Sequence, residues 1–116
     1  MNRFEAEVRA RGMTVFAHID HAAGATAVGL SLRPTELLIF GNAKTGTPLM
    51  QLTQTFGIDL PLKALVWQDA SGITWLSYND PAFLAHRHGQ EGADNPTVNA
   101  MAAALKAIAS KATTQL

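Results

Sequence analysis

The residues best suited to ligand chemistry directly follow an apolar run over residues 36–40. Asn42, Gly46 and Thr47 lie there, and Pro48 suits the first position of a helix. Backbone N–H groups at such a helix start, together with a polar side chain, could hold a phosphate or a carboxylate. Gly46 has the spacing from the preceding glycine that a phosphate-binding loop requires, but Thr47 occupies the lysine position, which argues against nucleotide hydrolysis. The structural alternative is a tight turn at the glycines, with Thr47 capping the helix.

A second junction places polar side chains at the end of the β-rich run 73–79. Asn79 has no evident structural role, whereas Asp80 could act as a general base, a metal ligand or a substrate contact. Asp80 also precedes Pro81 and suits the N-cap of a helix, a role worth about 1 kcal/mol. Because both junctions end strands, we expect them to line one cleft at an end of the sheet. The candidate ligand-binding residues are Asn42, Gly46, Thr47, Asn79 and Asp80.

The histidines are the remaining candidates for acid–base or metal chemistry. His18 and His21 flank Asp20, whose carboxylate could orient one imidazole. His86 and His88 lie about 200° apart around a predicted helix, so they are poorly placed to share a metal there. They also suit the last helical turn, where positive charge complements the dipole. His18, His21 and His86 are secondary candidates. No serine stands in a nucleophile-elbow context, which argues against an acyl-transfer triad. We expect no catalytic set, no metal and no cofactor.

Composition restricts the class of protein. A length of 116 residues predicts a single domain over 1–116, and the 47% hydrophobic and 16% charged shares are typical of globular proteins. Nine basic and nine acidic residues give zero net charge without a basic cluster, so we expect no nucleic-acid or membrane partner and some tendency to self-associate. The absence of cysteine excludes disulfides and thiolate metal sites. No signal peptide or membrane-spanning run is evident, which favours a cytoplasmic location.

Apolar periodicity and turn residues predict alternating helices and strands. The expected helices cover residues 3–11, 21–30, 48–57 and 81–89, and a last helix begins at Pro96. The expected strands cover 14–19, 36–40, 62–68 and 73–79, and a polar loop covers 89–94. Helices with one apolar side need a sheet to pack on, which predicts an α+β two-layer sandwich with about four strands and helices mainly on one face. Trp67 and Trp75 lie on the expected hairpin, where core packing is favoured over an interface role.

Several short motifs occur together in order along the chain. They are Gly12, Val15-Phe16, Ile19-Asp20-His21-Ala22, Phe40-Gly41-Asn42, Gly46-Thr47, Leu49-Met50, Asp59-Leu60-Pro61 and Ser77-Tyr78-Asn79-Asp80-Pro81. With these motifs the chain resembles the bacterial domain-of-unknown-function family 302. The resemblance implies a compact α+β fold, one sheet backed by helices, and homodimers, but no established activity. Ala43 departs from the family pattern, which usually has proline there.

Together these features favour a homodimeric, non-catalytic domain that binds a small molecule or a partner. One alternative is a metal-assisted or acid–base enzyme of the hydrolase type that uses Asp80 and a histidine. A further alternative is a purely structural or interaction module.

Overall fold

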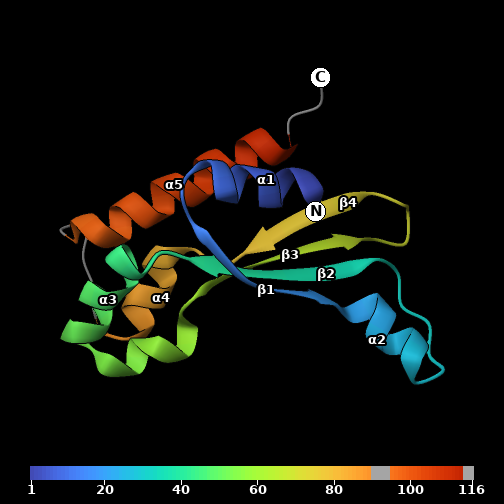
Figure 1. The fold of residues 1–116 in the computed structure, drawn as a ribbon, viewed down its shortest axis with the longest axis horizontal. Coiled ribbons are helices and arrows are strands. Elements are labelled where there is room, and N and C mark those ends of the chain that lie inside the picture. Colours follow the sequence, from blue (N-terminus) through green and yellow to red (C-terminus); the bar gives the residue numbers. More distant parts are fainter. Residues whose placement is uncertain (90–94, 114–116) are drawn as a thin grey trace.

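Four antiparallel strands form one sheet in which sequence neighbours pair, in the order β1-β2-β3-β4. The computed structural model describes residues 1–89 and 95–113 (Figure 1). The strands are β1 (Thr14–Asp20), β2 (Thr35–Gly41), β3 (Leu62–Gln68) and β4 (Thr74–Tyr78). Since every pair is antiparallel, β2 and β4 run in the same direction and end at the same end of the sheet. The polar loop expected over 89–94 lies outside the described residues apart from Gly89.

Helices cover one face and one end of this sheet. They are α1 (Asn2–Ala10), α2 (His21–Ala27), α3 (Ala43–Leu52), the 3-10 helix η1 (Gln54–Asp59), α4 (Pro81–Arg87) and α5 (Pro96–Thr113). In Figure 1, α1 and α5 lie along one face, α3 and α4 gather where β2 ends, and α2 projects at the opposite end. The predicted α+β class, with helices mainly on one face, is confirmed. None of the described helices combines the length and apolar character that a membrane span requires.

The hydrophobic core lies between α1, α5 and one face of the sheet. Leu38 and Phe40 of β2 are fully buried there, and Phe4 of α1 meets Phe40 edge to face with ring centroids 5.4 Å apart. Leu105 and Ile108 of α5 complete the contact at 1% and 0% exposure. These buried positions recur at strand spacing in β2 and at helical spacing in α5, so each element presents one apolar side to the same core.

The opposite face of the sheet is also apolar but remains open. Ile19, Leu37 and Leu65 are paired across three strands on this face, and Trp67 pairs with Trp75. The two indoles stack with centroids 6.3 Å apart, and Trp75 is 48% exposed. The expectation that both tryptophans pack in the core is therefore wrong. They occupy register positions that alternate with the buried row, so they point away from α1 and α5.

Two predicted helices also have different boundaries in the structure. The helix expected to begin at Pro48 begins at Ala43, because the Asn42 side chain caps it and accepts a hydrogen bond from the Lys44 N–H at 2.8 Å. It ends at Leu52, and Gly57 lies in the 3-10 helix that follows. The helix expected over 21–30 ends at Ala27, before Gly29 adopts a left-handed backbone with φ of 80°.

Candidate functional site

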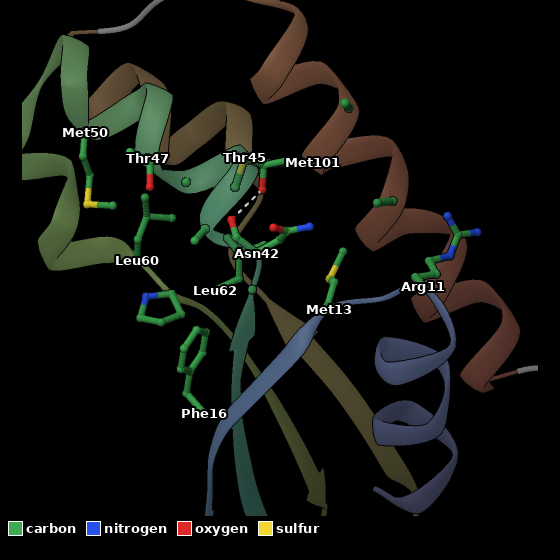
Figure 2. Close-up of a pocket in the computed structure, with 16 residues that line it drawn as sticks. Arg11, Met13, Phe16, Asn42, Thr45, Thr47, Met50, Leu60, Leu62 and Met101 are labelled. Atoms are coloured by element: carbon green, nitrogen blue, oxygen red, sulfur yellow. Dashed lines mark hydrogen bonds between the residues drawn. The ribbon is translucent and has the colours of Figure 1, made fainter.

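A cavity of about 420 Å³ opens at the end of the sheet where β2 runs into α3 (Figure 2). Its walls come from β1, the start of α3, the segment that precedes β3, and α5. Most of its side chains are apolar: Met13, Phe16, Ala43, Met50, Leu60, Pro61, Leu62, Ala100, Met101 and Ala104. A concave, largely apolar site with a few polar groups is the usual form of a small-molecule site.

Local features of the sequence create this space. The pairing of β1 with β2 shifts register between Val15 and Ala17, so Phe16 stands as an extra residue and lies exposed at the cavity. At Gly41 a Cβ would be in ordinary contact with the Pro61 Cβ at 3.5 Å and the Phe16 ring at 3.9 Å, so a side chain at this position would lie against both residues of the cavity wall. The α5 side of the cavity carries alanines, whose short side chains leave it unfilled.

The Asn42 backbone and side chain organise the polar wall of the cavity. The Asn42 carbonyl accepts hydrogen bonds from the Gly46 N–H at 2.9 Å and from the Thr45 hydroxyl at 3.0 Å. The Gly46 N–H is therefore used inside α3, and the anion cradle expected from Gly46 and Thr47 is wrong because the helix starts one turn earlier. Asn42, Gly46 and Thr47 nevertheless all line the cavity, because it lies beside the junction of β2 with α3.

Arg11 is the one charged residue among the sixteen that line the cavity. It is exposed and follows α1, whose basic and acidic side chains pair with other groups: Arg9 with Glu5 at 3.3 Å, and Glu7 with Lys111 at 3.7 Å. No carboxylate within the described ranges lies within 4.0 Å of the Arg11 guanidinium. Arg11 was not predictable as a cavity residue, because its place depends on how α1 packs beside α5.

The second junction does not join this cavity. The Asp80 Oδ1 caps α4 by accepting a hydrogen bond from the Ala82 N–H at 2.9 Å. Asp80 lines a separate hollow of about 350 Å³ with Tyr78 and Lys106, whereas Asn79 is exposed and lines neither hollow. The strands β2 and β4 do end together, but β3 separates them by two strand spacings, roughly 10 Å. The single cleft expected from both junctions is therefore not formed.

The candidate histidines lie apart from the cavity. His18 approaches two carboxylates, with Nε2 2.9 Å from the Glu36 Oε1 and Nδ1 3.6 Å from the Glu5 Oε1. His21 begins α2 at the other end of the sheet. His86 lies near the C-terminal end of α4, about 9 Å along the axis from the cap. Across residues 1–89 and 95–113, no three histidine, aspartate or glutamate side chains form a group that could hold a metal.

A histidine–carboxylate pair that the sequence does not predict links η1 to α4. The His88 Nε2 lies 2.5 Å from the Asp59 Oδ2, and Arg87 Nη1 lies 3.6 Å from Oδ1 of the same carboxylate. The His88 ring also stacks on Phe56 with centroids 4.7 Å apart. Asp59 belongs to a family motif, but only the fold brings it beside His88. Neither His88 nor Asp59 lines the cavity. The pair instead joins the end of η1 to the end of α4.

The fold and the cavity define a small α+β domain with a mainly apolar site at one end of its sheet. The family model for the domain of unknown function DUF302 matches residues 1–110, and the chain belongs to this family. The predicted resemblance is thereby confirmed. The crystal structure of an uncharacterised conserved DUF302 protein from Bacillus stearothermophilus has the same fold, with a TM-score of 0.82 at 19% identity over 96% of this chain and 86% of that one.

Curated relatives extend beyond the length of this chain. The chain is 50% identical over 101 residues to a fluoride-specific ion channel, FluC 1, of Brucella suis biovar 1 (strain 1330), which covers 87% of this chain and 40% of that protein. The match to FluC 1 of Brucella abortus biovar 1 (strain 9-941) has the same identity and covers 37% of that protein. The chain thus spans about two fifths of these relatives. Channel activity is a property named for those whole proteins.

Proposed function

We propose that this chain is a homodimeric, non-catalytic domain of the cytoplasm that binds a small molecule in the cavity beside Asn42. The observation that carries the proposal is the cavity itself, which has the volume and apolar lining of small-molecule sites. Two of its lining residues, Leu62 and Met101, are also core residues at 5% and 7% exposure. An apolar ligand would therefore displace water from side chains whose positions are set by core packing.

A second copy of the chain is the partner that the open face of the sheet favours. The apolar side chains of this open face are those of Ile19, Leu37, Ile39, Leu65, Trp67 and Trp75, and Lys63 and Ser77 also lie on it. Large exposed apolar patches on soluble proteins usually mark interaction sites. Zero net charge also leaves little repulsion between copies.

The helix α2 supports the same partner. It has seven residues and none of them is buried. Isolated helices shorter than about 12–15 residues are marginal in water, and a second copy packed on α2 would add to the contacts that it makes with β2. Val28 and Leu30 follow it at 72% and 66% exposure and would become covered in a dimer.

The hydrolase alternative is not favoured. It requires Asp80 as an acid–base group, whereas the Asp80 Oδ1 caps α4. His18 is held beside Glu36 and Glu5, and His21 lies at the far end of the sheet. The structural or interaction module remains the alternative if no ligand enters the cavity.

Thermal unfolding with a metabolite panel tests the binding proposal. A ligand at a hundred times its Kd should stabilise the folded chain by about 2.7 kcal/mol through mass action. The variant Ala100→Trp fills the cavity from α5 and should remove the shift. Ala103→Trp is the matched control, since Ala103 is exposed on the same helix and does not line the cavity. Binding that survives Ala100→Trp unchanged would contradict the assignment of the cavity.

A further inference from the structure

Two polar side chains of the cavity, those of Arg11 and Asn42, present N–H donors toward one end. Figure 2 shows Arg11 at the α1–α5 end and Met50 with Leu60 at the other, and the Asn42 side chain points toward the Arg11 end. The Asn42 Oδ1 is occupied by the Lys44 N–H at 2.8 Å. The Asn42 Nδ2 and the Arg11 guanidinium have no acceptor among residues 1–89 and 95–113, so this end offers N–H donors without a matching oxygen.

Positive charge at this end is not neutralised within the described part of the chain. The nearest acidic side chains on α1 are Glu5 and Glu7, which pair with Arg9 and Lys111 at 3.3 Å and 3.7 Å. Guanidinium groups form paired, charge-assisted hydrogen bonds with carboxylates. A ligand that brings one carboxylate would complement this end, whereas a cation would be repelled.

The rest of the cavity is suited to hydrocarbon. Met50 and Leu60 line the end away from Arg11, where the Thr47 hydroxyl is the polar group beside them in Figure 2. Methionine side chains are flexible and adapt to ligands of differing shape. The Thr45 hydroxyl already donates to the Asn42 carbonyl at 3.0 Å, so its proton is not available to a ligand.

We propose that the cavity takes a carboxylate with an apolar alkyl or aryl body, its head at Arg11 and Asn42 and its body toward Met50 and Leu60. This assignment rests on the proposed function, because it names the ligand class of the same cavity. Arg11 is a specificity-determining residue in this proposal: it selects the anionic head, while burial of the body supplies affinity that is independent of charge.

Three probes with the same alkyl chain test the ligand class by calorimetry, below their micelle-forming concentrations: decanoate, decanol and decyltrimethylammonium. Decanoate should bind tightest and decyltrimethylammonium weakest. Arg11→Gln should weaken decanoate binding by about tenfold and leave decanol binding unchanged, as expected for loss of one charge-assisted contact. Arg33→Gln is the matched control, because Arg33 does not line the cavity, and it should leave the preference for decanoate intact.

The possible failures are distinguishable. Equal binding of decanoate and decanol, both lost in Ala100→Trp, would overturn the carboxylate assignment and still support a small-molecule site. The same conclusion follows if Arg11→Gln weakens both probes equally. If none of the three probes binds and no metabolite stabilises the chain, both the ligand class and the proposed function are overturned.

Discussion

At the scale of single residues, Asp69 is the carboxylate whose surroundings most clearly favour its charged form. The Trp75 Nε1 donates to the Asp69 Oδ2 at 2.8 Å, and the Ile73 and Ser71 N–H groups donate to Oδ1 at 3.0 Å and 2.9 Å. These bonds, that from Trp75 first, hold the pKa of the Asp69 carboxyl below its ordinary value of 3.8. The carboxylate thus ties the hairpin turn to the tryptophan on the open face.

We predict that this contact makes the hairpin acid-sensitive. The folded-state pKa is depressed, so the stabilisation is present above the unfolded-state pKa near 3.8 and is lost as the pH falls through the folded-state value. A carbon-detected NMR titration of the Asp69 carboxyl should show the low midpoint. In Trp75→Phe, which lacks the indole N–H, the midpoint should rise. An unchanged midpoint in that variant would contradict the role given to Trp75.

At the scale of elements, α3 provides the sharpest prediction. Asn42→Ala removes the side chain that caps the helix and should destabilise the chain by about 1 kcal/mol. Thr47→Ala should change stability by less than about 0.5 kcal/mol, because Thr47 is exposed within the helix and caps nothing. Urea unfolding of the two variants gives the comparison. A larger loss in Thr47→Ala would restore the helix start expected from the sequence.

Most elements of the fold were predictable from the sequence, but the start of α3 was not. α5 was predictable from its apolar stripe at helical spacing, and the strands from alternation or, in β2, from a short continuous apolar run. The start of α3 was not, since Asn42, Thr47 and Pro48 are all acceptable at a helix start and only the end of β2 decides between them. The side of Trp67 and Trp75 was also undetermined, because β2 is a continuous apolar run whose two faces look alike.

The candidate site was predictable in part for a related reason. Asn42, Gly46 and Thr47 line the cavity because a strand-to-helix junction stands at an end of the sheet, and chain order alone reveals that junction. Arg11, Phe16 and the alanines of α5 come from other elements. Their contributions depend on a β-bulge and on how α1 and α5 pack together, neither of which has a period in the sequence.

At the scale of the whole molecule, the two surfaces proposed for binding lie on different sides of one hydrophobic core. The cavity lies where β2 meets α3, while the open face lies on the side of the sheet away from α1 and α5. The buried side chains form one cluster that includes residues of α1, β2, β3 and α5. A single cluster predicts that the domain unfolds as one unit, with dimer dissociation coupled to unfolding.

We therefore predict that the thermal unfolding midpoint rises with protein concentration, because association stabilises the folded chain by mass action. The dimer should bury at least roughly 1,000 Å² in total. Trp75→Lys places a charge on the open face and should give a monomer by sedimentation, with a midpoint independent of concentration. Phe83→Lys is the matched control, because Phe83 is 59% exposed on α4 and lies outside the open face. If Phe83→Lys dissociates the protein and Trp75→Lys does not, the second copy binds elsewhere, and a monomer at all concentrations would exclude the dimer.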